Sequence, residues 1–175
     1  MRMRTIAAVA MAAAVAMGTA FATTPAQAAP SASHGPYQFK NDYSHLCMDV
    51  ASGATHDGAR IQQWDCYGGA PTKWRLEFTA HLNGWSYYKF VNVHSGRCLD
   101  VPNGSMDAGV ELQQWGCWGG DMQQWALVEA GTGGSVTVRN RRSGLCLDVR
   151  NWGGAGASLQ QWRCNQLAVQ TWRFS

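Results

Sequence analysis

From residue 37 onward, the apolar residues of this chain occur in short runs separated by turn residues. Some runs alternate apolar with polar residues, as in 37–41 and 74–78, which is the period of a β-strand with one buried face. Turn signals such as Ser52-Gly53 and Gly68-Gly69 stand between the runs, and none of the runs has helical periodicity. The pattern predicts an all-β fold with strands at 37–41, 47–50, 61–64, 74–78, 87–93, 98–101, 110–115, 125–128, 136–140, 146–149, 158–162 and 172–174.

The predicted strands belong to a sequence that occurs three times. Each copy contains Cys-Leu-Asp-Val (Cys-Met-Asp-Val in the first), then Gln-Gln-Trp-x-Cys, and a second tryptophan ten residues after the first. The first cysteines, Cys47, Cys98 and Cys146, are 51 and 48 residues apart. Propellers typically need about four to eight blades of this size. Three copies, at about 37–80, 87–130 and 135–175, therefore favour a compact threefold barrel, with 79–86 and 131–134 as joints.

The first 28 residues have the pattern of a secretory signal peptide. Arg2 and Arg4 precede an Ala/Val/Met-rich run at 6–20, and Ala26-Gln27-Ala28 is a small-x-small cleavage signal. A membrane anchor is the alternative, but the run is shorter than the ~20 residues that span a bilayer. We expect a signal peptide at 1–28, a flexible leader at 29–35, one domain at 36–175, and a secreted, extracellular protein.

All six cysteines lie in the predicted mature chain, two in each copy. A secreted protein favours disulfides over free thiols. Six cysteines allow many pairings, and the repeat selects the pairing within each copy: Cys47–Cys66, Cys98–Cys117 and Cys146–Cys164. Zinc is the alternative, but spacings of 19, 19 and 18 residues without a Cys-x-x-Cys pair do not fit a zinc site.

The formal net charge of +3 overstates the positive charge of the mature protein. Without Arg2 and Arg4, twelve Lys/Arg oppose eleven Asp/Glu, whereas all nine tryptophans remain. Phosphate recognition on nucleic acid needs far more positive charge than this. A near-neutral, tryptophan-rich secreted chain favours an uncharged ligand. We expect a monomer without a metal, a cofactor or a membrane partner.

The three sets of Cys-x-Asp-Val, Gln-Gln-Trp-x-Cys and Gln-x-Trp motifs resemble those of the ricin B-chain type lectin family. Gln-x-Trp stands at Gln123-Gln124-Trp125 and Gln170-Thr171-Trp172, whereas the first copy has Thr72 in place of the glutamine. The resemblance covers about residues 37–175. It implies a β-trefoil, with six strands in a barrel and six in a hairpin cap. It also implies non-covalent sugar binding, as in lectins and the carbohydrate-binding modules of glycosidases.

The same resemblance implies up to three sugar pockets. The family aspartate bonds two hydroxyls, a glutamine assists, and an aromatic ring stacks on the apolar face of the sugar. The ligand would be a polysaccharide or glycan that contains galactose, xylose or arabinose. The first pocket would hold Asp49, Gln62 and Trp64, the second Asp100, Gln113 and Trp115, and the third Asp148, Gln160 and Trp162, with Tyr67, Trp118 and Asn165 near the second cysteines also lining them.

One family position differs in all three copies. Family pockets usually carry asparagine just before the Gln-x-Trp glutamine, and here that position holds Pro71, Met122 and Val169. None of these side chains donates a hydrogen bond, and each missing bond loses roughly 0.5–1.5 kcal/mol. The substitutions favour an alternative function, in which a trefoil without sugar binding binds a protein, for example as a hydrolase inhibitor. The intact Asp-Gln-Trp sets favour sugar binding.

Structural roles are the alternative for several of these residues. One Cys-x-Asp-Val aspartate alone could cap the turn after its strand, but three aspartates matched to Gln and Trp favour sugar contact in at least one pocket. No Gly-x-Ser-x-Gly or His-Glu-x-x-His motif is present, so we expect no enzymatic activity. We expect Trp74, Trp125 and Trp172 in the core, backbone bonding by Gln123 and Gln170, and Trp85, Trp118 and Trp152 in loops that can form a binding surface.

Overall fold

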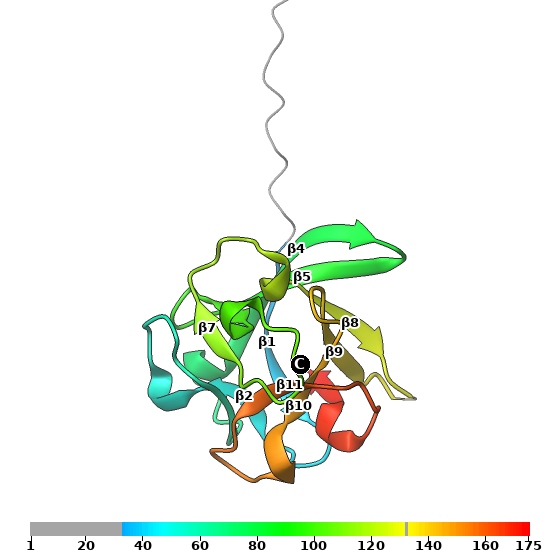
Figure 1. The fold of residues 1–175 in the computed structure, drawn as a ribbon. Coiled ribbons are helices and arrows are strands. Elements are labelled where there is room, and N and C mark those ends of the chain that lie inside the picture. Colours follow the sequence, from blue (N-terminus) through cyan, green and yellow to red (C-terminus); the bar gives the residue numbers. More distant parts are fainter. Residues whose placement is uncertain (1–32, 132) are drawn as a thin grey trace, which may run out of the picture.

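The computed structural model describes residues 33–131 and 133–175 as an all-β fold (Figure 1). The predicted signal peptide lies outside the described residues. The structure contains six short 3₁₀ turns: η1 Ala51–Gly53, η2 Ala70–Thr72, η3 Pro102–Gly104, η4 Asp121–Gln123, η5 Arg150–Trp152 and η6 Ala168–Gln170. The strands are β1 Ser33–Asn41, β2 Cys47–Val50, β3 Ile61–Trp64, β4 Lys73–Leu82, β5 Trp85–Asn92, β6 Cys98–Asp100, β7 Gln113–Trp115, β8 Trp125–Glu129, β9 Val136–Asn140, β10 Cys146–Val149, β11 Leu159–Trp162 and β12 Trp172–Phe174.

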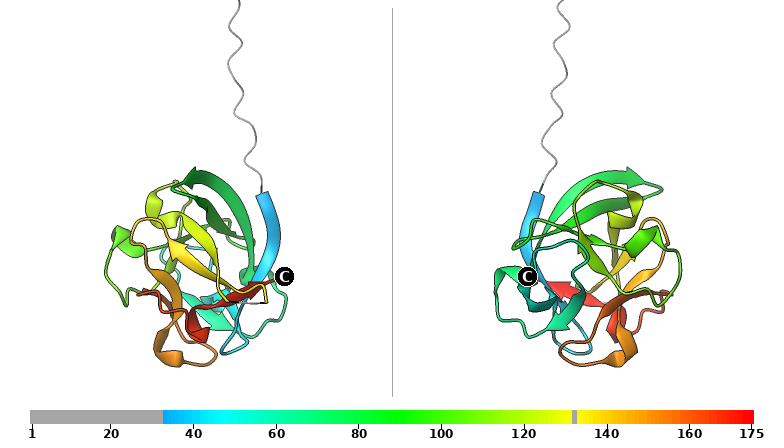
Figure 2. Two further views of the ribbon diagram at one scale, coloured as in Figure 1. Left: turned by 90° about the vertical axis from the view of Figure 1, so that its right-hand side faces the viewer. Right: turned by 60° about the vertical axis from the view of Figure 1, so that its left-hand side comes forward.

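Six strands close into an antiparallel barrel. β1 pairs with β4, β4 with β5, β5 with β8, β8 with β9, β9 with β12, and β12 with β1 again. Closure removes the exposed strand edges that an open sheet would leave. It also brings the C-terminal strand against the first one, as both views of Figure 2 show.

The other six strands form three hairpins that cap the barrel. They are β2–β3, β6–β7 and β10–β11, one in each repeat. Single bridges join the hairpins in a triangle: Arg60 to Gln113, Gln62 to Ser158, and Glu111 to Gln160. Six barrel strands and six cap strands with threefold repetition make a β-trefoil, which confirms the predicted fold class.

The repeated tryptophans fill the centre of the molecule. Trp74, Trp125 and Trp172 are fully buried, as predicted, and pack with residues such as Phe39 and Phe90. Each indole N–H donates to a backbone carbonyl of its own repeat: Met48, Leu99 and Leu147. The buried rings therefore leave no indole N–H unsatisfied. The three predicted disulfides, Cys47–Cys66, Cys98–Cys117 and Cys146–Cys164, are all formed.

Several strand bounds differ from the sequence prediction; the strand expected at 110–115, for example, spans only Gln113–Trp115. Two further differences concern segments that were predicted to lie outside the strands. The predicted leader at 29–35 ends too late, because β1 already begins at Ser33, where the backbone pairs with Glu77 of β4. The predicted joint at 79–86 is mostly strand, since β4 and β5 continue to a two-residue turn at Asn83-Gly84. Both turn residues have positive φ, 52° and 80°, as an Asn-Gly hairpin requires. This long hairpin projects from the body in Figure 1.

Candidate functional site

The hairpin register places each predicted aspartate directly opposite its glutamine. Asp49 faces Gln62, Asp100 faces Gln113, and Asp148 faces Gln160. In each pair the glutamine Nε2 donates to the carboxylate, at 2.9, 2.8 and 2.7 Å respectively. One hairpin thus assembles most of a pocket from residues that are 12 or 13 positions apart in the chain.

A second glutamine supports the carboxylate in two of the repeats. Gln123 Nε2 donates to Asp100 at 3.1 Å, and Gln170 Nε2 donates to Asp148 at 2.9 Å. The same amides also bond the backbone, for example the carbonyls of Gly116 and Arg163. The expected backbone bonding is therefore confirmed, and each amide in addition orients a pocket carboxylate.

The three carboxylates are nearly buried, yet they do not cap turns. Asp49, Asp100 and Asp148 are only 3–5% exposed, and among the described residues no backbone amide donates to any of them. Burial raises the pKa of each carboxyl group, and the glutamine amides partly oppose this by donating to the charged form. The turn before each of these strands is capped by an asparagine: Asn41, Asn92 and Asn140 accept, through Oδ1, from the backbone amides two and three residues on.

An exposed indole stands next to each carboxylate. Trp64, Trp115 and Trp162 are 41–43% exposed, in contrast to the buried tryptophans of the barrel. The Cβ of an alanine at Gly156, Gly58 or Gly109 would lie only 3.5, 3.9 or 3.2 Å from the respective ring. Each of these glycines belongs to a different repeat from the ring, so one side of each indole packs on a neighbouring repeat.

The second pocket is a small cavity between two tryptophans. Its lining includes Asp100, Gln113, Trp115 and Trp118. The Trp118 ring is 61% exposed and lies over Gly120, where an added Cβ would come within 2.1 Å of the ring. Because Gly120 has no side chain, the Trp118 ring can occupy this space.

The third pocket has a different second wall. Asp148, Gln160 and Trp162 line it together with Trp152 and with Asn165, Leu167 and Val169. Asn165 stands where the second repeat has Trp118, and its side chain accepts from the amide of Leu167. The aromatic residue opposite Trp162 thus comes from η5, at the other end of the hairpin.

The first pocket lacks the second glutamine. Thr72, which replaces it, donates to the carbonyl of Gly69 and accepts from Gln38, so it does not support Asp49. The Tyr67 hydroxyl lies 3.5 Å from Asp49 Oδ1 instead. The carboxylate of this repeat is therefore held by one amide, with a phenol at its opening.

The position that usually carries asparagine has a structural role here. The backbone carbonyls of Pro71, Met122 and Val169 accept from Asn92, Asn140 and Asn41 of the next repeat in the ring. Met122 and Val169 add apolar lining to the second and third pockets. The pockets consequently offer carboxylate and amide groups on one side and an apolar floor on the other.

The second glutamine of each Gln-Gln-Trp motif connects repeats instead of lining a pocket. Gln63, Gln114 and Gln161 are fully buried. Gln114 Nε2 donates to the carbonyls of Ala54 and His56 in the first repeat, and its Oε1 accepts from Ser95. Equivalent bonds join Gln63 to Gly153 and Gly154, and Gln161 to Ser105 and Asp107. Adjacent glutamines thus have separate roles, one in the pocket and one in the assembly of the trefoil.

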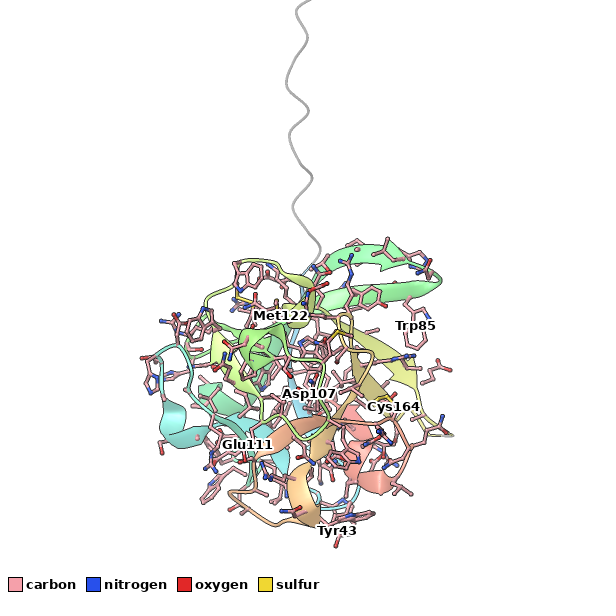
Figure 3. All side chains as sticks on the ribbon, in the orientation of Figure 1. Tyr43, Trp85, Asp107, Glu111, Met122 and Cys164 are labelled. Carbon is pink, nitrogen blue, oxygen red and sulfur yellow. A yellow bond between two sulfur atoms is a disulfide. The ribbon has the colours of Figure 1, made fainter. Side chains whose placement is uncertain are left out.

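Trp85 does not form the predicted loop surface. It is the first residue of β5 and is partly buried, at the side of the long hairpin in Figure 3. The Arg139 guanidinium lies over its ring, 5.1 Å from the centroid, and Arg141 lies similarly over Tyr87 at 5.7 Å. Two of the three arginines at 139–142 therefore pack on aromatic rings, so this basic run does not require an acidic ligand to explain it. No helix in the described part of the chain is long and apolar enough to cross a membrane.

The trefoil with its three capping hairpins is the fold of ricin-type lectin-like domains. The family model described as ricin-type beta-trefoil lectin domain-like matches residues 27–87, 74–162 and 129–175. The chain therefore belongs to the ricin-type β-trefoil lectin-like family.

Several known proteins are similar to this chain. A designed threefold-symmetric protein, ThreeFoil, is 36% identical, with a TM-score of 0.72 over 79% of this chain and 96% of the designed one. The exo-beta-1,3-galactanase 1,3Gal43A from Clostridium thermocellum is 34% identical, with a TM-score of 0.72 over 79% of this chain. Serine protease 1 from Rarobacter faecitabidus is 32% identical over 47% of this chain. This chain covers only 29% of the galactanase and 22% of the protease.

Proposed function

We propose that this protein is a secreted lectin that binds carbohydrate non-covalently, mainly through its second and third pockets. One observation carries the proposal: a nearly buried carboxylate, held by two glutamine amides, beside an indole that is left exposed. A carboxylate offers about four acceptor positions, and the two amides use two of them. The remaining positions can accept from two neighbouring sugar hydroxyls.

The energetic cost of burying these carboxylates favours sugar binding over a purely structural role. Desolvation of Asp100 and Asp148 disfavours their charged form, and a scaffold alone has no need of a half-exposed Trp115 or Trp162. Both features suit a ligand that brings hydroxyl donors to the carboxylate and a C–H face to the indole. No step of this binding requires a metal, a cofactor or a chemical reaction.

Galactose polymers are the first ligands to test. The similarity to an enzyme named as an exo-beta-1,3-galactanase supports β-1,3-galactan. Xylose and arabinose polymers are tested beside it, because they also offer hydroxyl groups and C–H faces. Each site is shallow, so we expect weak binding of single sugars. Two pockets on one rigid scaffold can engage one polymer and gain strength through effective concentration.

Retention on insoluble polysaccharides tests the proposal. The mature protein would be applied to β-1,3-galactan, xylan and arabinan matrices, alongside Asp100→Ala, Asp148→Ala and the double variant. Gly154→Ala is the matched control, because no atom lies within 4 Å of the added Cβ. We expect retention on at least one matrix, competition by the free sugar, a partial loss in each single variant and near-complete loss in the double variant.

Other outcomes would refute the proposal. A folded, disulfide-bonded protein that is retained on no matrix would point to the protein-binding alternative. Sugar products that accumulate in the same incubations would show enzymatic activity. Secretion is tested separately, since expression from the natural N-terminus in a secreting host should release a protein that begins at Ala29.

A further inference from the structure

Trp152 has a backbone conformation that glycine adopts in the other two repeats. Its φ is 55°, and the equivalent residues of η1 and η3 are Gly53 and Gly104, with φ of 60° and 59°. A bulky residue is strained in this left-handed region. The Trp152 side chain is also 49% exposed, so extensive burial does not offset the strain.

Trp152 contacts a second exposed aromatic ring from the first repeat. Tyr43, in the turn between β1 and β2, packs edge-to-face on it, with centroids 5.0 Å apart and an interplanar angle of 90°. Tyr43 is also 49% exposed and lies at the rim of the molecule in Figure 3. The positions equivalent to Tyr43 are His94 and Arg142. The aromatic pair is thus specific to the boundary between the third and first repeats.

The second repeat has no room for such a side chain. A Cβ at Gly104 would lie 2.5 Å from Met122 Cε and 3.0 Å from Arg142 Nε. In the third repeat Val169 replaces Met122, and the cavity has a volume of about 370 Å³ against about 170 Å³ in the second. Trp152 lines this larger cavity together with Trp162 and Asp148.

We propose that the third pocket continues over Trp152 toward Tyr43 and binds successive units of a linear oligosaccharide. This inference rests on the proposed lectin function and assigns the third pocket a preference for chains over single sugars. Asp148 and Trp162 hold one unit, and the next unit places its apolar face on Trp152. Tyr43 holds the Trp152 ring in place from the other side and extends the aromatic surface to the rim.

The test compares a single sugar with its oligomer. All variants are made in an Asp49→Ala/Asp100→Ala background, so that the third pocket alone keeps its aspartate. Titration calorimetry would use galactose and β-1,3-galactotetraose, and xylose and xylotetraose. The variants are Trp152→Gly, which restores the glycine of the other repeats, and Tyr43→His, which copies the second repeat. Asp148→Ala is the control that should abolish binding of both sugar lengths.

We expect Trp152→Gly to weaken tetraose binding about tenfold, the size typical of a lost aromatic contact, and to change monosaccharide binding less than twofold. Its urea midpoint should equal or exceed that of the parent, because the strain is relieved. Equal losses for both sugar lengths, an unchanged tetraose affinity, or a lower urea midpoint would each overturn the inference and leave Trp152 a packing residue. A parent that binds none of the four sugars, although the unmutated protein is retained on a polysaccharide matrix, would overturn this inference alone. The proposed function itself fails only if the unmutated protein is retained on no matrix.

Discussion

Gln113 and Gln114 are neighbours in one motif, and the structure predicts opposite consequences for their loss. Gln113 is partly exposed and donates to Asp100 in the pocket at 2.8 Å. Gln114 is fully buried and makes three hydrogen bonds, two to the carbonyls of Ala54 and His56 and one from Ser95. Gln114→Ala should therefore impair folding, and Gln113→Ala should impair sugar binding.

The magnitudes follow from the bonds that each variant loses. Three hydrogen bonds at a net value of about 1 kcal/mol each make Gln114→Ala about 3 kcal/mol less stable. The loss is larger if no water replaces the amide at the carbonyls of Ala54 and His56. In a domain of this size, that loss lowers Tm by roughly 6–12 °C. Gln113→Ala loses one partly exposed bond, about 0.5–1 kcal/mol, and Gln123 still holds the Asp100 carboxylate.

Urea unfolding and polysaccharide retention measure the two effects on the same preparations. An Asp148→Ala background keeps the third pocket from masking a loss in the second. We expect Gln113→Ala to lose retention with a nearly normal urea midpoint, and Gln114→Ala to lose stability yet be retained well below its transition. If Gln114→Ala is no less stable than Gln113→Ala, the buried glutamine does not hold the repeats together and the reasoning fails.

Three further predictions concern the pocket residues. Because burial raises the folded-state pKa of Asp100, retention should decline as the pH falls through this raised pKa, at a higher pH than for an ordinary carboxylate. The effect of Asp100 on the stability of the fold has the opposite pH dependence. Its stabilising contribution is fully present below the ordinary pKa of aspartate and is lost as the pH rises through the raised folded-state pKa. Asp100→Asn removes the desolvated charge, but its single carbonyl oxygen can accept from only one of Gln113 and Gln123, and its NH2 group faces the other amide. The lost hydrogen bond costs about 1 kcal/mol and offsets the relief of desolvation, so retention should fall while the urea midpoint at pH 7 stays near that of the parent; unchanged retention would contradict the role of the carboxylate. Gly120→Ala should displace the Trp118 ring, which would lie 2.1 Å from the added Cβ, and shift Met122, whose Sδ would lie 2.7 Å from it. Both side chains line the second pocket, so its affinity should fall roughly threefold to tenfold, whereas unchanged affinity would show that neither contacts the ligand.

Much of the fold could be predicted because the repeat is explicit in the residues. Cysteine spacing, strand alternation and the tryptophans at Trp74, Trp125 and Trp172 recur at almost constant intervals. One local pattern, found three times, is therefore enough to predict a threefold β-structure. The hairpin register then follows from the same pattern, because the strands that contain Asp100 and Gln113 are adjacent in sequence. The Asp-Gln pairs, which the family resemblance implied, are consistent with this register.

The remaining features depend on contacts between distant parts of the chain. The family resemblance assigned Gln113 to the pocket, but the sequence assigned no role to Gln114, since the neighbouring repeat supplies the carbonyl partners of that buried side chain. The sequence also did not show that Gln123 and Gln170 reach the carboxylates of their repeats, because their bonds span 23 and 22 residues. The Tyr43–Trp152 pair joins residues more than a hundred positions apart through closure of the trefoil.

The sequence by itself therefore determined the repeat, the all-β class and the disulfide pairing, and its family resemblance implied the trefoil and the Asp-Gln-Trp set of each repeat. The tertiary structure decided how the three pockets differ. Each pocket is bounded by its own hairpin and by a neighbouring repeat, and the residues that meet at such a boundary are far apart along the chain. Local periodicity encodes the hairpin, but the shape of a surface at a repeat boundary depends on which side chains the closed barrel brings together.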